Sequence, residues 1–175
     1  DLILKALHYL KVIYNVNNVE FLIIGDGPYR SKLEKETIEL NINNLVKFTG
    51  WVSHEKISEY LIDSDIGVIP HKVCEFTNST LPNKLFDYML YGLAILATNA
   101  KPVKYIIETE KCGVIIPEDP LKVAQIIVYL KNNKEKVLEM GKRGHKAVLE
   151  KYNWEIEAKV IESTIKLIEK TDFLK

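Results

Sequence analysis

The residues best suited to chemistry lie in one polar stretch, residues 77–88, which reads TNSTLPNKLFDY. Lys84 and Asp87 stand three positions apart, so on a helix they share one face near its positive end. The N–H groups of residues 80–85 and the Lys84 ammonium would together suit a phosphate or diphosphate. The Asp87 carboxylate could accept hydrogen bonds from two hydroxyls, as a ribose presents them. The alternative is a solvent-facing Lys84–Asp87 pair beside a capping Thr80.

Two further loops follow predicted strands. Gly25-Asp26-Gly27-Pro28 comes directly after an apolar run, and its two glycines would let the backbone approach a ligand closely, although a plain tight turn is an equal alternative. Trp51 and Val52 end another strand, where their main-chain atoms could meet a base, although packing is the simpler explanation for Trp51. Neither loop carries a complete dinucleotide fingerprint or a Walker lysine.

The four histidines and two cysteines show no metal-ligand spacing and no partner in a catalytic motif. No metal ion is therefore expected. The cysteines, Cys74 and Cys112, are expected to be reduced thiols in a cytosolic protein. The histidines are expected to be surface or cap residues: His8, His54, His71 and His145.

The chain of 175 residues carries 24 lysines and arginines against 24 aspartates and glutamates, so its formal net charge is zero. This balance argues against binding to duplex nucleic acid, which needs a basic excess, but permits a small anionic ligand. Only Arg30 and Arg143 are arginines, so phosphate binding would depend on lysine and backbone N–H groups. No apolar run approaches the roughly 18 residues of a membrane span, and no signal peptide is evident.

Strand and helix patterns alternate along the chain and must position these loops. Short apolar runs predict strands at residues 19–24, 45–52, 65–69, 93–97 and 113–116. After an initial helix, further helices are predicted at residues 29–40, 55–62, 83–91, 103–109, 121–130, 134–150 and 154–169. Gly92 is expected to follow one helix end, and Asp119-Pro120 to begin another, while residues 71–81 are predicted as a loop. This alternation predicts an α/β fold with a parallel sheet flanked by helices.

Both ends of the chain have a helical pattern. The sequence opens with apolar residues at helical spacing and no capping segment before them, so we expect a fragment of a longer chain: Leu4, Leu7, Leu10, Ile13 and Tyr14. The last predicted helix carries an apolar stripe that is expected to pack in the core: Trp154, Ala158, Ile161, Ile165 and Ile168.

Six blocks of the sequence, in the expected order, resemble retaining glycosyltransferase family 4. They are FLIIGDGP, VKFTGWV, SDIGVIP, LPNKLFDYMLYGLAILAT, GVIIPEDP and KYNW. PNKLFDYM is the most telling. In that family two Rossmann-like domains face each other across a cleft, the GT-B architecture, and the C-terminal domain binds the nucleotide-sugar donor. The resemblance implies that residues 1–175 are that C-terminal domain, without its first strand and without the N-terminal acceptor-binding domain.

The resemblance also implies roles for the loop residues. The family signature of two glutamates falls on Ser79 and Asp87, so Asp87 would hold the donor ribose, with a reach shorter by one methylene. Ser79 departs from the glutamate that touches the donor sugar, as in the branch of the family with Pro-Asn-Lys. The candidate sugar contacts are then Asn78, Ser79 and Thr80.

By the same resemblance, Lys84 and the backbone of residues 80–85 would face the diphosphate, and the base would face Trp51 and Val52. Lys84 and Asp87 are the expected catalytic pair. The full set of expected donor-binding residues is Gly25, Gly27, Trp51, Val52, Asn78, Ser79, Thr80, Leu81, Asn83, Lys84, Leu85 and Asp87.

The implied reaction transfers a hexose-type sugar from a UDP- or GDP-sugar to a glycan or lipid-linked acceptor, with retention. Catalysis would depend on donors that stabilise charge growing on the departing diphosphate, without a metal or other cofactor. In the family a basic pair that also grips the diphosphate lies just upstream of the first helix. Without that pair and the acceptor domain, the fragment alone is expected to have little or no activity. A cytoplasmic location is expected, compatible with a parent enzyme at the inner membrane face.

Two other interpretations stay open. A GT-B sugar-nucleotide epimerase shares the architecture, although the Pro-Asn-Lys helix speaks against it. A non-catalytic flavodoxin-like binding module would lack the diphosphate site. The sequence leaves the base, the sugar, the acceptor and the oligomeric state undetermined.

Overall fold

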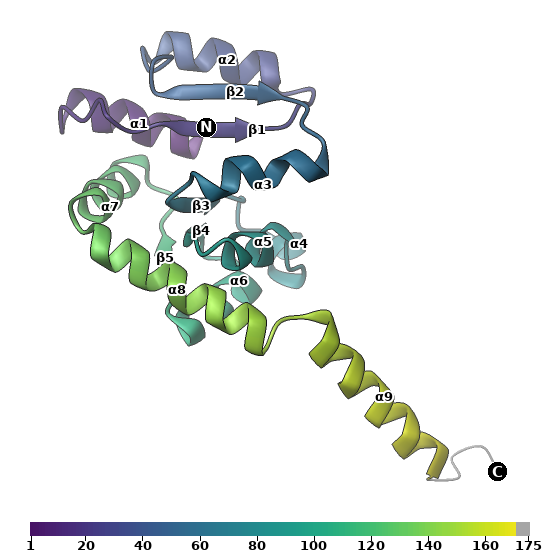
Figure 1. Ribbon diagram of the computed structural model, residues 1–175. Coiled ribbons are helices and arrows are strands. Elements are labelled where there is room, and N and C mark those ends of the chain that lie inside the picture. The colour runs from purple at the N-terminus through teal and green to yellow at the C-terminus, as the bar shows by residue number, and fades with distance from the viewer. Residues whose placement is uncertain (171–175) are drawn as a thin grey trace.

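The structure is a computed structural model that describes residues 1–170, and helices and strands alternate along it (Figure 1). The strands are β1 (Phe21–Ile24), β2 (Val46–Gly50), β3 (Ile66–Ile69), β4 (Ala94–Thr98) and β5 (Gly113–Ile116). The helices are α1 (Leu2–Val12), α2 (Arg30–Glu39), α3 (His54–Ile62), α4 (Glu75–Ser79), α5 (Lys84–Leu90), α6 (Lys101–Glu110), α7 (Pro120–Asn132), α8 (Lys134–Glu150) and α9 (Trp154–Lys170). The prediction of an α/β fold with parallel strands is confirmed.

The described strands form two parallel sheets instead of the single sheet that was expected. One has the order β1-β2 and the other the order β3-β4-β5. Figure 1 shows β1 and β2, with α2, above the three strands of the second sheet. Because β1 and β3 each pair on one edge only, the hydrogen bonds of the sheets do not cross from one half of the molecule to the other.

Strand β4 forms the centre of the larger sheet, and all five of its residues are buried. Alternate side chains point to opposite faces of a strand. Leu96 accordingly joins a core cluster with α1 and α7, and Ile95 joins a second cluster with α5, α6 and the end of α8. Burial on both faces explains why β4 is apolar throughout, as in other parallel sheets.

Helix α8 approaches the turn after α5 so closely that glycine is required on it. A Cβ atom added to Gly141 would lie 1.9 Å from the carbonyl oxygen of Gly92. Gly92 itself has φ of +69°, which fits its predicted place just after α5, in the left-handed conformation. This contact fixes how far α8 stands from the carboxyl end of α5.

The predicted helix boundaries are largely confirmed. Asp119 caps α7 through its carboxylate, which accepts hydrogen bonds from the N–H groups of Leu121 and Lys122, and Pro120 is the first residue of the helix. The prediction of a loop at residues 71–81 is partly wrong, because this segment contains the short helix α4.

The prediction that the stripe on the last helix packs in the core is wrong. Figure 1 shows α9 leading away from the rest of the described molecule. The exposed fraction is 75 % at Trp154, 47 % at Ile161 and 50 % at Ile165. The helical period was therefore correctly identified, but an amphipathic period does not show which surface covers the apolar face. No helix within residues 1–170 is long and apolar enough to span a membrane.

Candidate functional site

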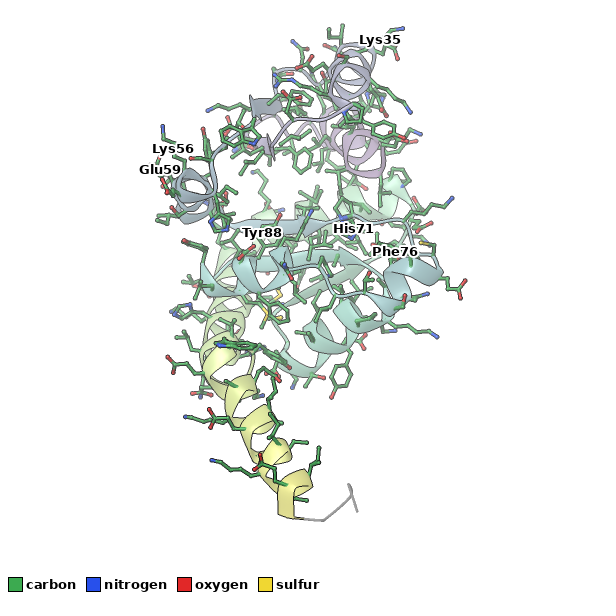
Figure 2. All side chains as sticks on the ribbon, turned by 90° about the vertical axis from the view of Figure 1, so that its right-hand side faces the viewer. Lys35, Lys56, Glu59, His71, Phe76 and Tyr88 are labelled. Atoms are coloured by element: carbon green, nitrogen blue, oxygen red, sulfur yellow. The ribbon has the colours of Figure 1, made fainter. Side chains whose placement is uncertain are left out.

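The loops that follow the strands lie at the carboxyl ends of the two sheets, where ligands bind in open parallel sheets. In Figure 1 the loops after β1 and β2 lie on the same side of the molecule as α4 and α5. Figure 2 views the molecule from that side, and His71, Phe76 and Tyr88 lie near its middle. The polar stretch selected from the sequence connects β3 to α5 and is the most elaborate of these loops.

Helix α5 is held against β3 by a glycine and a tyrosine. A Cβ atom on Gly67 would lie 2.3 Å from the ring of Tyr88, so the strand needs a glycine for the helix to approach. Burial raises the pKa of the Tyr88 hydroxyl, and the nearby Asp87 carboxylate adds to the effect. Leu85 and Met89 are fully buried under the helix. The start of α5, with Lys84, is thus fixed relative to the end of β3.

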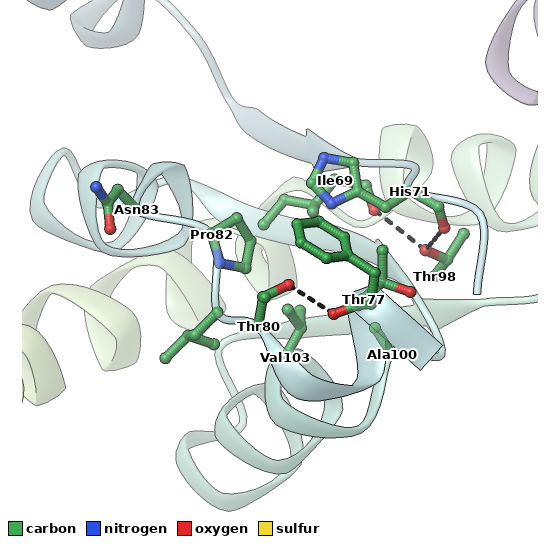
Figure 3. A pocket seen from close by; sticks show the side chains of 11 residues that line it. Ile69, His71, Thr77, Thr80, Pro82, Asn83, Thr98, Ala100 and Val103 are labelled. Atoms are coloured by element: carbon green, nitrogen blue, oxygen red, sulfur yellow. Dashed lines mark hydrogen bonds between the residues drawn. The ribbon is translucent and has the colours of Figure 1, made fainter. Parts of the chain in front are cut away.

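A cavity of about 290 Å³ lies between the ends of β3 and β4, helix α4 and the start of α5 (Figure 3). Its polar lining consists of hydroxyl, amide and imidazole groups, and its apolar lining comes from the end of β3, from α4, from the loop before α5 and from the start of α6. No lysine, arginine, aspartate or glutamate lines it. The residues are Ile69, His71, Phe76, Thr77, Thr80, Leu81, Pro82, Asn83, Thr98, Ala100 and Val103.

Two residues of this cavity, His71 and Thr98, were missed as site residues in the sequence. The buried Thr98 hydroxyl, at the end of β4, donates a hydrogen bond of 2.5 Å to the backbone carbonyl of His71 and so joins the ends of the two strands. Both residues stand at or just beyond the carboxyl end of a strand, which is the signal that could have identified them. Their positions in the sequence do not reveal that they meet.

Of the three expected sugar contacts, Asn78, Ser79 and Thr80, one lines the cavity and two do not. Thr80 lines the cavity, and its hydroxyl donates to the carbonyl of Phe76 (2.9 Å). The hydroxyl of Ser79 donates to backbone carbonyls within α4 (3.0 Å), and the side-chain oxygen of Asn78 accepts from the N–H of Lys101 (3.0 Å). Asn78 thereby satisfies an N–H group in the first turn of α6. Neither Asn78 nor Ser79 lines the cavity.

The expected row of free backbone donors is shorter than the sequence suggested. The N–H of Leu85 already donates to the carbonyl of Pro82 (3.0 Å), and proline has no N–H to offer. Leu85 is therefore a buried core residue and not a ligand donor, which corrects one expected site residue. Within residues 1–170 the N–H groups of Leu81, Asn83 and Lys84 have no backbone partner.

Lys84 and Asp87 are both exposed, and no ion pair joins them in the described part of the chain. The alternative of a Lys84–Asp87 pair is therefore not what the structure shows. Lys84 lies near enough to His71 for its positive charge to lower the pKa of that imidazole, in addition to the larger effect of burial. Lys84 follows Asn83, which lines the cavity, but Lys84 itself is not part of the lining.

The glycine loop after β1 is a tight turn held by its own contacts. The N–H of Gly27 donates to the carboxylate of Asp26 (2.8 Å), and the N–H of Gly25 donates to the carbonyl of Gly50 at the end of β2 (3.0 Å). Arg30 forms ion pairs with Asp26 and Glu34. These contacts favour the turn alternative, because the Gly25 and Gly27 donors are already used.

The loop after β2 exposes its aromatic residue. Trp51 is 77 % exposed and Val52 is half-buried, so packing does not explain Trp51. Neither residue lines the cavity. Among residues 1–170, no three histidine, cysteine, aspartate or glutamate side chains come together as a possible metal site.

Parallel strands flanked by helices, with a ligand-sized cavity at their carboxyl ends, define an α/β domain of the class that binds small ligands at strand ends. The model of the family "Glycosyl transferases group 1" matches residues 1–133, and the chain belongs to this family. Its fold is that of the C-terminal domain of GT-B enzymes.

Among curated proteins, the 2-deoxystreptamine N-acetyl-D-glucosaminyltransferase of Niallia circulans is 30 % identical over 84 residues, 48 % of this chain and 20 % of that protein. The amylovoran biosynthesis glycosyltransferase AmsK of Erwinia amylovora is 26 % identical over 121 residues, 68 % of this chain and 30 % of its own length. The chain therefore spans less than a third of these relatives.

Solved structures give the same fold. Anabaena HepE in complex with UDP-glucose matches with a TM-score of 0.78 and 18 % identity, over 94 % of this chain and 44 % of the other. The C-terminal domain of a glycosyl transferase group 1 family protein (LpcC) from Francisella tularensis matches with a TM-score of 0.69 and 19 % identity, over 87 % of this chain and 77 % of that domain.

Proposed function

We propose that this chain is the donor-binding domain of a retaining glycosyltransferase that transfers a hexose-type sugar from a nucleotide diphosphate to a glycan or lipid-linked acceptor. The observation that carries the proposal is the family match over residues 1–133, which include the cavity and all three loops. A structural relative that binds UDP-glucose, HepE, supports it. So do the names of the curated relatives, an N-acetyl-D-glucosaminyltransferase and an amylovoran biosynthesis glycosyltransferase.

The diphosphate is proposed to bind beside Lys84. The ammonium offers three donors, and the N–H groups of Leu81 and Asn83 add two neutral ones, which suits an oxygen-rich anion. Negative charge grows on the diphosphate as the bond to the sugar breaks. Donors fixed in place before the reaction stabilise that charge more than the charge of the bound substrate, which accelerates the step.

The nucleoside is proposed to lie outside the cavity. Asp87 has an exposed carboxylate on α5, one turn from Lys84, and it can accept hydrogen bonds from the two ribose hydroxyls. Trp51 offers an exposed aromatic ring for the base, and Val52 offers main-chain atoms. Gly25 and Gly27 are proposed to border the cleft without donating to the ligand, because their N–H groups already donate to Gly50 and Asp26.

The chain is further proposed to be one half of a two-domain enzyme. In the doubly wound order 3-2-1-4-5-6, one strand lies between the strands that correspond to β1 and β3. The edges of β1 and β3 without a partner are consistent with such a strand, which would precede α1 in the sequence and unite the two sheets. An acceptor-binding domain would precede it, and the chain alone would then bind donor but transfer little or no sugar.

Substitution of Lys84 tests the diphosphate site. Lys84→Ala should weaken binding of UDP, or of GDP if that is the preferred nucleotide, by about 10-fold or more, because a hydrogen bond from a charged donor is lost. Isothermal titration calorimetry of the folded chain measures this. Lys142→Ala, which removes an exposed lysine from α8, is the matched control and should bind as the wild type does. Equal affinities in both variants would remove Lys84 from the diphosphate site.

Substitution of Asp87 tests the ribose site separately. Wild-type protein should bind UDP about 10-fold more tightly than the analogue without the 2′- and 3′-hydroxyls, since a carboxylate accepts strong hydrogen bonds. Asp87→Ala should bind the two nucleotides equally, with unchanged circular dichroism. If the variant still distinguished them as the wild type does, the ribose would have to be held elsewhere.

A further inference from the structure

The cavity has the size and chemistry of a site for one sugar ring. Its volume of about 290 Å³ lies at the lower limit of the roughly 300–1,000 Å³ typical of small-molecule pockets, which is too small for a whole nucleotide sugar. Three threonines, one asparagine and one histidine supply its polar side chains, and the rest of the lining is apolar. The three threonine hydroxyls already donate to backbone carbonyls and can only accept, whereas the Asn83 amide and the His71 imidazole can do both. Such a lining matches hydroxyls, which bring a donor hydrogen, better than it matches phosphates, which bring only acceptors.

His71 differs from the histidines that serve the fold. The ring Nδ1 of His8 lies 2.8 Å from the carbonyl oxygen of Leu40, and that of His145 lies 2.6 Å from the carbonyl oxygen of Leu90. The His71 ring has no hydrogen-bond partner within residues 1–170, and it lines the cavity. Only its backbone carbonyl is engaged, by Thr98. Within residues 1–170 the His71 ring therefore faces the cavity with both of its nitrogen atoms available to a ligand.

The surroundings of His71 favour the neutral imidazole. Burial lowers its pKa, and the positive charge of Lys84 lowers it further. A neutral imidazole carries one N–H donor and one acceptor nitrogen, and a sugar hydroxyl carries the complementary pair. A phosphate offers acceptors alone, and Lys84 supplies donors for it. These two side chains can therefore divide the donor substrate between them.

We infer that His71 binds a hydroxyl of the transferred sugar inside the cavity and that it is a specificity-determining residue of the domain, distinct from the phosphate-binding Lys84. This inference depends on the proposed function. The segment from β3 to the start of α5 then contacts both the sugar and the diphosphate of the donor. Its sugar end is held by the Thr98–His71 hydrogen bond, and by a second bond in which the N–H of Val73 donates to the carboxylate of Glu118 (2.9 Å).

The test compares each nucleotide with its sugar-bearing form in calorimetric titrations of the folded chain. The probes are UDP with UDP-glucose and GDP with GDP-mannose. His71→Ala should weaken the sugar nucleotide by about 3- to 10-fold, the effect of one hydrogen bond, and leave the free nucleotide unchanged. His71→Gln, which keeps a neutral donor and acceptor, should recover most of the loss. Lys84→Ala should weaken both members of the pair.

Each outcome is informative. His145→Ala, outside the cavity, is the control and should leave both affinities as they are. If His71→Ala weakened the nucleotide and the sugar nucleotide equally, or neither, the sugar role of His71 would be overturned while the proposed function stood. If wild-type protein bound none of the four probes, the proposed function itself would fail, and His71 would lose its substrate with it.

Discussion

Strands β1 and β4 are both apolar, yet they are buried to different extents. All five residues of β4 are buried, whereas all four residues of β1 are only half-buried. Strand β4 pairs on both edges and is covered by helices on both faces, while β1 pairs with β2 alone. An apolar run therefore predicts a strand, but the strands and helices that pack against it determine how much of its surface is buried.

The same difference separates the parts of the site. Every residue that lines the cavity lies between positions 69 and 103, on elements packed around β4. The half with β1 and β2 contributes only two loop ends, one a self-contained turn and the other an exposed tryptophan. The groups proposed to hold a sugar and a diphosphate therefore lie on the better-packed half.

The largest expected effect comes from deleting the same side chain in both strands. Leu96→Ala in β4 should lower the free energy of unfolding by about 2–5 kcal/mol, because it leaves a cavity in a fully buried core. Leu22→Ala in β1 should cost about half as much, since that side chain is already partly in water. Urea denaturation followed by circular dichroism measures both. Equal losses would contradict the contrast between the two halves.

A glycine pair gives the next effect. Gly141→Ala should destabilise the protein by about 1–3 kcal/mol, because the new methyl group would collide with the backbone of Gly92 and push α8 away. Gly27→Ala, in the loop after β1, has no atom within 4 Å of the added Cβ and should stay within about 0.5 kcal/mol of the wild type. A thermal melt of each variant distinguishes them. A neutral Gly141→Ala would show that α8 can shift freely.

The smallest effect concerns two ion pairs. Glu110 on α6 accepts hydrogen bonds from Lys151 (2.9 Å to each oxygen) and from the hydroxyl of Tyr152 (2.9 Å). Burial alone would raise the pKa of this carboxyl, but these partners outweigh it and lower the pKa. The carboxylate therefore stabilises the fold above its unfolded pKa of about 4.5, and this contribution is lost as the pH falls through the lower folded value.

Glu110→Gln should accordingly cost about 1 kcal/mol at pH 7 and progressively less below pH 4.5. The control is Glu34→Gln in α2, which breaks a more exposed ion pair with Arg30 and should change stability by less than about 0.5 kcal/mol. Denaturation measured from pH 7 to pH 3 follows both variants. A loss at Glu110 that did not depend on pH would show that its charge is not what stabilises the fold.

Local patterns predicted much of this molecule. The strand at residues 113–116 is found as predicted, Asp119 and Pro120 begin α7, and Gly92 follows α5 in the left-handed conformation. Each of these features depends on a few neighbouring residues, whose backbone preferences are encoded locally. The polar stretch at residues 77–88 supplies five of the eleven residues that line the cavity, and its role in binding stays a prediction.

Features that depend on distant partners were not predicted. The separation into two sheets depends on which strand edges meet, and the exposure of Trp154 depends on what α9 lies against. The junction of His71 and Thr98 joins residues 27 positions apart. One local hydrogen bond was also missed: the N–H that Leu85 was expected to donate to a ligand is donated to the carbonyl of Pro82.

The two cysteines differ in how accessible their thiols are to a reagent. Cys74 is exposed, and hydrogen bonds to its sulfur from the backbone N–H and then from the hydroxyl of Thr77 lower its pKa. Cys112 is buried before β5, and burial raises its pKa to about 11, so it reacts only after the packing around it opens. The rate at which a thiol reagent modifies Cys112 would therefore report opening of the packing around β5, whereas Cys74 would be modified in the folded protein.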